Sequence, residues 1–201
     1  DTISSIAGNI QALSESFLID KDVQAFINTS IIDKNNMSDM YIWKDMFNKY
    51  HLAGANIRSV YLYSSTNNWV IGNGSAVKMD ATMYTATLSF TGLTYQQWQE
   101  FIKKDLANGF YLMDNGELIY RMNILTTGYR RSILLIRVNI TPMAEALQSA
   151  MLEGGYISVL GNNGELILSL GIPPFKDFSI LKDWGSDTEK LSTKIPTGYE
   201  F

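Results

Sequence analysis

The sequence predicts an α+β fold in which antiparallel sheets are flanked by helices and preceded by a long N-terminal helix. In the first 50 residues, apolar side chains recur every three to four positions, which is the period of an amphipathic helix. From Ile57 onward the period changes to two, in short runs separated by turn residues, which is typical of strands and hairpins. The hydrophobic content of 46% and the charged content of 18% are those of an ordinary globular protein.

An apolar stripe marks the N-terminal helix. Its members follow one another at spacings of 3, 4, 3 and 4 residues, and they are Ile3, Ile6, Ile10, Leu13 and Phe17. The stripe predicts a long amphipathic helix that continues through Val23, Phe26 and Ile27 beyond an interruption at residues 20–22. The stripe either packs only on its own domain or also pairs with a second copy of the chain. Two heptads are fewer than a coiled coil needs, so the pattern does not decide between these interpretations.

Three further helices follow from cap residues and apolar spacing. One is expected over residues 40–50, with Ser38 as its N-cap and Gly54 closing it. The next is expected to begin after the N-cap residue Thr94 and to end at residues 108–109. The last is predicted over residues 142–152, where a threonine and a proline favour a helix start.

Strands are predicted where β-branched, aromatic and other apolar residues cluster between turn residues. In the first part of the chain they cover residues 60–63, 69–71, 85–90, 110–113, 117–125 and 131–140. Asn115-Gly116, between two of these runs, is a strong hairpin signal. Later strands are predicted at 156–160, 165–170 and 191–195, with a short helix near 178–184.

The inventory of side chains limits the chemistry that the chain can perform. The sequence has no cysteine, which excludes disulfides and thiolate chemistry, and His51 is its single histidine. The net charge of −4 disfavours nucleic acid as a partner. No nucleophile elbow, phosphate loop or metalloprotease motif occurs, and a small hydrolase would need a catalytic dyad that the sequence does not offer. We therefore expect no catalytic residue, no metal and no cofactor.

The succession of a helix and a hairpin occurs twice, which suggests two related modules. The hairpins span residues 60–71 and 157–167. With the long N-terminal helix, the connecting helix and the segment Gly155–Ile167, this order of elements resembles that of a double Cache sensor domain. Val60–Ser64 resembles the opening strand of the first module of such a domain, and residues 133–141 resemble its last strand.

The resemblance implies two PAS-like modules stacked along a long helix. Residues 1–54 would form the helical stalk and packing helix of the first module, and residues 55–140 its membrane-distal sheet. Residues 141–154 would be a connecting helix, and residues 155–201 a smaller membrane-proximal module, cut short.

The resemblance also implies a function. Double Cache domains are the extracytoplasmic sensing parts of bacterial membrane receptors, here most similar to those of histidine kinases and AraC-type regulators, and their distal module binds a small molecule. The chain begins at Asp1, and no apolar run reaches the roughly 18 residues of a spanning helix, so we expect the spans of an anchored parent to lie outside it.

Candidate ligand-binding residues lie in the first module. Tyrosines 61 and 63 share one strand face, as do Arg121 and Asn123, and Trp98 lies on a helix that could cover the sheet. Aromatic walls with a few polar groups are typical of binding pockets, and arginine suits a carboxylate or phosphate. The predicted ligand-binding residues are Tyr61, Tyr63, Trp98, Tyr111, Arg121, Asn123 and Arg131. Alternatively, the aromatic residues belong to the core and the arginines to the surface.

The identity of the ligand is narrowed by one departure from the family. Amino-acid-binding double Cache domains carry an Arg-x-Trp-Tyr motif in the covering helix region. If Trp98 is aligned with that tryptophan, Gln96 and Gln99 replace the arginine and the tyrosine, which disfavours an amino acid as the ligand. The alternative function is a protein-interaction module that pairs with a second copy through the N-terminal helix and binds no small molecule.

Overall fold

The computed structural model of the chain describes residues 2–33, 37–51, 56–125, 131–151, 155–160 and 166–171. The chain divides into two compact units, Asp1–Ala146 and Leu147–Phe201. Several predicted features lie outside the described residues: the helix end at Gly54, the hairpin turn at residues 161–164, and the helix and strand expected after residue 171.

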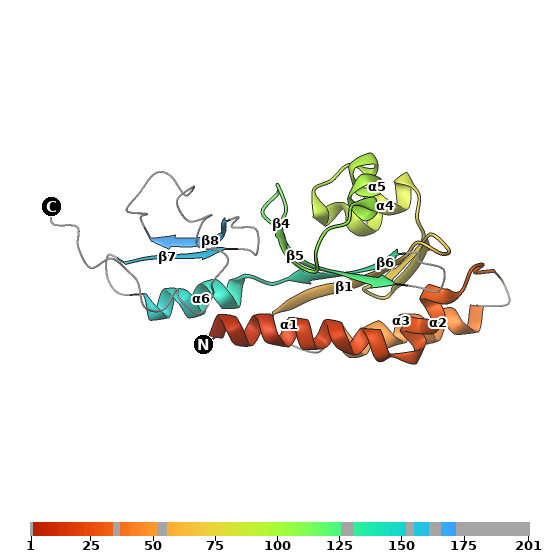
Figure 1. Ribbon diagram of the computed structural model, residues 1–201, viewed down its shortest axis with the longest axis horizontal. Helices are drawn as coiled ribbons and strands as arrows, with labels where there is room; N and C mark the ends of the chain where they lie inside the picture. Colours follow the sequence, from red (N-terminus) through yellow and green to blue (C-terminus); the bar gives the residue numbers. More distant parts are fainter. Residues whose placement is uncertain are drawn as a thin grey trace. The chain divides into compact units, whose positions relative to one another are not determined.

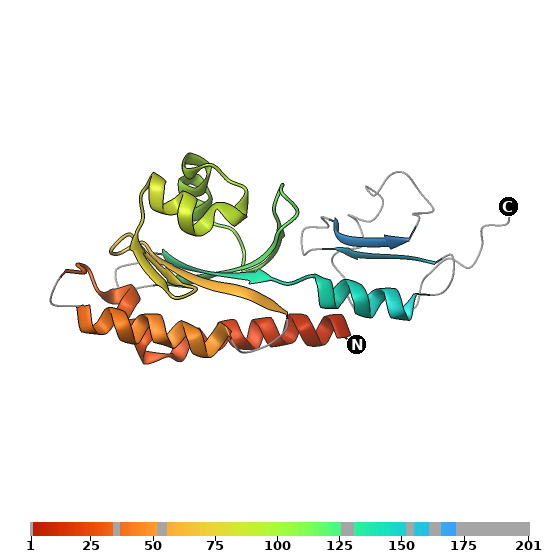
Figure 2. The same cartoon turned by 180° about the vertical axis from the view of Figure 1, so that it is seen from behind.

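The first unit is built on a six-stranded antiparallel sheet with the order β3-β2-β1-β6-β5-β4 (Figures 1 and 2). Its strands are β1 (Ile57–Ser64), β2 (Trp69–Gly72), β3 (Ser75–Lys78), β4 (Gly109–Leu112), β5 (Leu118–Leu125) and β6 (Arg131–Val138). The long strands β1, β6 and β5 lie at the centre, where most of their residues are buried. Helices cover both faces of the sheet, so the α+β fold with antiparallel strands is confirmed.

Three N-terminal helices cover one face of this sheet: α1 (Thr2–Ile19), α2 (Lys21–Asn28) and α3 (Met37–His51). Helix α1 contacts β5, while α2 and α3 contact β1. Ile10 and Phe17 of the predicted stripe are 1% and 0% exposed. These side chains of the stripe therefore pack on their own domain, and pairing of the helix with a second copy stays a prediction.

Two details of these helices differ from the prediction. The chain breaks at Asp20, whose carboxylate accepts hydrogen bonds from the backbone N–H groups of Asp22 and Val23 at 2.8 and 3.3 Å. This N-cap starts a separate helix, α2, where a continuation of the first was expected. Helix α3 begins at Met37, so Ser38 lies in its first turn and not at its cap position.

The opposite face is covered by α4 (Ala81–Leu88), the 3₁₀ helix η2 (Ser89–Thr91) and α5 (Tyr95–Lys103) (Figure 1). The strand predicted at residues 85–90 is wrong. The Asp80 carboxylate caps α4 by accepting from the Met83 backbone N–H at 2.8 Å, and Tyr84 and Leu88, one helical turn apart, are both buried. Tertiary burial and the cap prevail over the strand preference of the threonines and Phe90.

Helix α5 begins as predicted but ends earlier. Thr94 forms a capping box: its hydroxyl accepts from the Gln97 backbone N–H at 3.2 Å, and the Gln97 side chain accepts from the Thr94 backbone N–H at 2.8 Å. The helix stops at Lys103, where residues 108–109 were expected to end it, and Lys104 has an extended backbone. The Asn115-Gly116 hairpin between β4 and β5 is confirmed, with Gly116 at a φ of 81°.

After β6 the chain enters α6 (Thr141–Ala150), which runs across the division between the two units. The second unit then contains an antiparallel hairpin of β7 (Tyr156–Leu160) and β8 (Leu166–Gly171). Both strands were predicted at nearly these bounds.

Candidate functional site

One face of the six-stranded sheet gathers most of the predicted ligand-binding residues. Tyr61 and Arg121 both lie opposite Leu135 of β6, and Tyr63 and Asn123 both lie opposite Ile133. Alternate residues of a strand point to the same face, so all four side chains lie on the side of the sheet that α4 and α5 cover. Tyr111, opposite Ile119, joins them there.

The aromatic residues among them form a core. The Trp98 side chain is 0% exposed, and its ring lies 5.8 Å from that of Tyr63 and 5.9 Å from that of Tyr84. Tyr61 stacks on Phe90 at 5.2 Å. Burial raises the pKa of Tyr63, so its phenol is neutral at physiological pH. This cluster fixes α4 and α5 on the sheet and supplies one apolar wall to the region beside it.

Arg121 is fully buried and holds the loop that follows α5. Its Nη1 donates to the carbonyl oxygen of Leu106 at 3.0 Å, and its Nη2 donates to that of Lys104 at 3.2 Å. The guanidinium also lies 5.2 Å from the centre of the Phe101 ring. No described carboxylate forms an ion pair with it, and desolvation lowers its pKa from the usual value. Arg121 therefore positions the loop at residues 104–106.

Asn123 and Tyr111 secure the same stretch of chain. The Asn123 side-chain amide donates to the Leu106 carbonyl oxygen at 2.7 Å, and the Tyr111 hydroxyl donates to the Ala107 carbonyl oxygen at 2.6 Å. Three side chains of the sheet thus bind backbone groups of the loop at residues 104–108, which is only five residues long. The loop has a fixed path, and the side chain of Asp105 projects from it.

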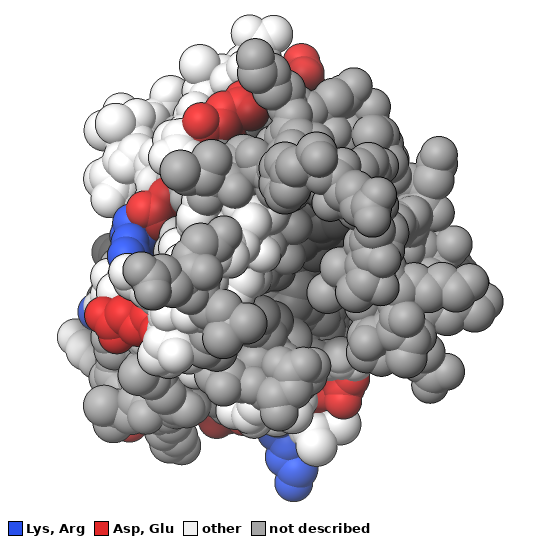
Figure 3. All heavy atoms as spheres, turned by 90° about the vertical axis from the view of Figure 1, so that its left-hand side faces the viewer, with Lys and Arg blue, Asp and Glu red and all other residues white. Residues whose placement is uncertain are grey.

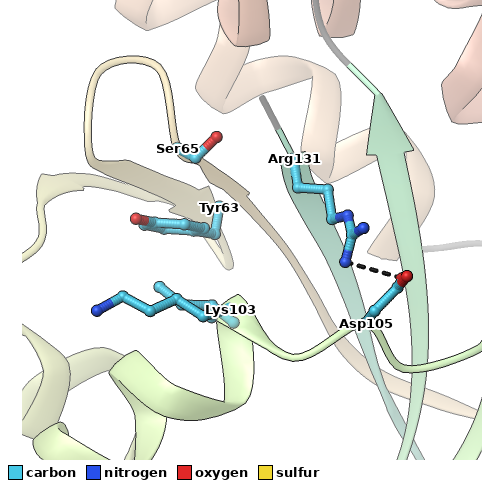
Figure 4. A pocket seen from close by; sticks show the side chains of 6 residues that line it. Tyr63, Ser65, Lys103, Asp105 and Arg131 are labelled. Carbon is cyan, nitrogen blue, oxygen red and sulfur yellow. Dashed lines mark ion pairs between the residues drawn. The ribbon is translucent and has the colours of Figure 1, made fainter. Parts of the chain in front are cut away.

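Arg131 and Asp105 form an ion pair at the edge of this region, with 2.8 Å between Nη1 and Oδ1 (Figure 4). The Asp105 side chain is 83% exposed and that of Arg131 is 33% exposed. Such an exposed pair contributes about 0.2 to 1 kcal/mol, because water screens both charges.

A pocket of about 470 Å³ opens beside this ion pair. Its lining residues come from β1 and the turn after it, from the end of α5 and the loop after it, and from the start of β6: Tyr63, Ser65, Ile102, Lys103, Asp105 and Arg131. In Figure 4 the Arg131 and Asp105 side chains point toward each other, and the Lys103 stem runs beside the Tyr63 ring. The volume lies within the range of about 300 to 1,000 Å³ that is typical of small-molecule sites.

Of the predicted site residues, Tyr63 and Arg131 line the pocket, whereas the other five are not among its described lining residues. Four lining residues were missed: Ser65, Ile102, Lys103 and Asp105. They belong to no motif. The one sequence signal that could have found them is the charged run Lys103-Lys104-Asp105 directly after an amphipathic helix, since polar residues at the end of a helix that covers a sheet lie at the sheet's edge.

A second charged cluster lies on this face of the sheet. It is formed by Glu117, directly before β5, by Arg137 of β6 and by Arg58 of β1. The Glu117 carboxylate accepts a hydrogen bond from Nε of Arg137 at 2.9 Å and another from Nη2 of the same residue. Nη1 of Arg58 lies 3.5 Å from Oε1 of Glu117. The Arg137 hydrogen bonds hold the pKa of Glu117 below its usual value. The Arg137 guanidinium lies 5.2 Å from the centre of the Phe90 ring, so the cluster ties η2 to the sheet. Its charges are satisfied, and we assign it to structure.

Figure 3 shows one end of the molecule, where the described acidic and basic side chains are interspersed and not gathered by sign. Within the described ranges, no group of three or more His, Asp and Glu side chains is arranged to hold a metal ion. No helix in these ranges has the length and apolar character needed to cross a membrane.

Comparisons of the chain with protein-family models, with curated proteins and with solved structures give no match.

Proposed function

We propose that this chain is the extracytoplasmic ligand-sensing domain of a bacterial transmembrane signal-transduction receptor, and that its role is recognition and not catalysis. The observation that carries the proposal is the pocket of about 470 Å³ beside β1, β6 and the end of α5, in which an apolar wall of Tyr63 and Ile102 faces polar and charged side chains. The sheet with helices on both faces is also the architecture that the resemblance to a Cache module implies.

The position of the pocket suits signalling. Arg131, which lines it, is the first residue of β6, and α6 begins three residues after the last residue of that strand. A ligand that contacts the start of β6 can therefore bias the strand that leads into the connecting helix. Such a ligand shifts the equilibrium between two receptor states only as far as it binds one state more tightly than the other.

The proposal includes a second, smaller module of PAS-like type after the connecting helix. The division of the chain at Ala146 and Leu147 and the hairpin of β7 and β8 support it. The parent would be a membrane-anchored histidine kinase or an AraC-type regulator, with transcription as the final output.

The ligand site is tested by thermal-shift screening of the purified chain against a metabolite library, because a ligand that binds only the folded state raises its stability. The variant Lys103→Trp places a large side chain in the pocket and is expected to abolish the shift given by any hit. Lys104→Trp is the matched control, since Lys104 is exposed and does not line the pocket. A hit that is lost equally in both variants would contradict this pocket as the site.

Placement outside the cytoplasm is tested separately. An alkaline-phosphatase reporter fused after residue 201 in the natural gene product is expected to be active, since the enzyme folds only after export. The gene should also encode spans of about 20 apolar residues beside this chain. An inactive fusion, or the lack of such spans, would overturn the receptor proposal.

The second candidate function is a dimerisation module, and one observation favours it. Apolar side chains at the end of α1, after α2 and at the start of α3 are exposed: Leu18, Ile19, Ile31, Tyr41 and Ile42. Since the predicted stripe is buried within the chain, a homodimer through the N-terminal helices would have to use such residues instead.

A further inference from the structure

The charges around the pocket are unequal. Among its described lining residues, Lys103 and Arg131 are cationic and Asp105 is the single carboxylate. Lys103 forms no ion pair with any described residue. The buried guanidinium of Arg121 binds the loop that carries Asp105 and adds a third positive charge. No described carboxylate forms an ion pair with it, although the charge of Asp105 acts on it from a distance.

The one anion in the pocket is weakly held. The Asp105 side chain is 83% exposed, so the solvation of its carboxylate changes little when the carboxylate moves away from Arg131. Its backbone neighbours do not move with it, because Arg121 and Asn123 hold the carbonyl oxygens of residues 104 and 106. Only the side chain has to rotate toward solvent to uncover the Arg131 guanidinium.

The rest of the lining fits the body of an organic molecule. The Tyr63 ring and the Ile102 side chain form an apolar wall, and the hydroxyl of Ser65 is buried without a hydrogen-bond partner among the described residues. A buried hydroxyl without a partner costs free energy that a ligand oxygen placed there would recover.

We propose that the pocket binds a small organic anion, a carboxylate or a phosphate monoester on an apolar body, whose charged group displaces Asp105 from Arg131. In Figure 4 the Lys103 ammonium points away from Arg131, so Lys103 is the second cation for the anionic group only after its exposed side chain turns toward Arg131. Tyr63 with Ile102 contacts the apolar body. Asp105 thus acts as an internal competitor that occupies Arg131 in the empty pocket. The inference rests on the proposed ligand site and names the chemistry that this site recognises.

The competitor role makes a prediction that separates this ligand class from a zwitterion. Removing the Asp105 charge frees Arg131, so an anion is expected to bind Asp105→Asn about two- to fivefold more tightly, which corresponds to the loss of one exposed ion pair. An amino acid would need Asp105 for its ammonium group, and the same substitution would weaken its binding.

The experiment uses benzoate and phenyl phosphate as probes, with neutral benzamide and zwitterionic phenylalanine for comparison. Binding to the full 201-residue chain is followed by NMR titration, including the side-chain Nε–H signals of the arginines. At least one of the two anions is expected to shift the Arg131 signal, whereas benzamide does not. Arg131→Gln is expected to weaken that binding about tenfold or more, since hydrogen bonds to a charged partner are lost.

Matched variants complete the test. Lys103→Gln is expected to weaken anion binding, while Lys104→Gln leaves it unchanged, because only the first of these neighbours lines the pocket. Asp114→Asn, on an exposed turn, controls for the change in net charge made by Asp105→Asn. Binding that is equal in wild type and Arg131→Gln, or that weakens in Asp105→Asn, would overturn the inference, as would the absence of binding by both anions.

Failure of this inference differs from failure of the proposed function. Suppose that benzamide or a neutral metabolite binds and that Lys103→Trp, but not Lys104→Trp, blocks the binding. The pocket is then confirmed as the ligand site, and the assignment of an anion as its ligand is wrong. If no compound distinguishes these two variants, the ligand site itself fails.

Discussion

The guanidinium of Arg121 donates a hydrogen bond of 3.0 Å to the carbonyl oxygen of Leu106. A residue of β5 thus binds the loop that directly follows α5. A helix that continued past Lys103 would use the backbone carbonyl of Lys104 for its own hydrogen bonds. Here a buried side chain satisfies the carbonyl oxygens of both Lys104 and Leu106. The path of the loop beside the pocket is therefore set by a contact between distant parts of the sequence.

Arg121→Ala is expected to lower the free energy of unfolding by about 3 kcal/mol, because it removes the donor to the Lys104 carbonyl oxygen and one of the two donors to that of Leu106, and it opens a cavity in place of a fully buried side chain. Chemical denaturation measures the loss, and hydrogen exchange at residues 104–108 should quicken. Arg58→Ala, whose side chain is 41% exposed, should cost less than about 1 kcal/mol. Equal losses in the two variants would contradict the assignment.

Glu117 predicts a dependence of stability on pH. Its folded pKa is lowered by the Arg137 hydrogen bonds, so its contribution is present above the unfolded pKa and is lost as the pH falls through the folded value. Glu117→Gln should destabilise the protein by about 1 to 2 kcal/mol at pH 7, and the difference from wild type should close as the pH falls below about 4. Glu100→Gln makes the same change of net charge at an exposed position and is the control.

Thr94 caps α5, which carries two lining residues of the pocket at its end. Thr94→Ala removes the side-chain acceptor of the capping box and should cost about 1 kcal/mol in denaturation experiments. Thr94→Ser keeps the hydroxyl and should restore most of that loss. A serine variant as unstable as the alanine variant would show that the methyl group, and not the cap, matters.

The buried stripe of α1 predicts that charge on this face unfolds the first unit. Ile10 is 1% exposed, so Ile10→Asp buries a carboxylate without a partner and should abolish the cooperative melt followed by circular dichroism. Ala12→Asp, on the exposed side of the same helix, should leave the melt nearly unchanged. A folded Ile10→Asp protein would contradict the packing of α1 on the sheet.

Association through the helices is expected to depend on other residues. If the chain forms dimers, the double variant Leu18→Asp and Ile19→Asp should dissociate them while the monomer still melts cooperatively, because both side chains are exposed. Sedimentation velocity measures the association. A dimer that persists in this variant would place the interface elsewhere.

Local sequence patterns determined much of this fold. The spacing of Ile6, Ile10 and Phe17 predicts both the helix and its buried face, because one stripe in a period of 3.6 must be covered. The Thr94 cap and the Asn115-Gly116 turn act within a few residues, so they can be read directly from the chain. Likewise, the alternation of Arg121 and Asn123 placed them on one face of the sheet before their partners were known.

The tertiary structure alone decided what lies against those elements. Residues 81–88 form a helix because Tyr84 and Leu88 are buried in the aromatic cluster, which no local preference of the threonines reveals. The pocket unites the turn after β1, the end of α5 and the start of β6, and the side chains of Lys103 and Asp105 gain their position from strand residues far along the chain. Periodicity fixes which face of an element is buried, whereas the partner of that face depends on the register and packing of the whole sheet.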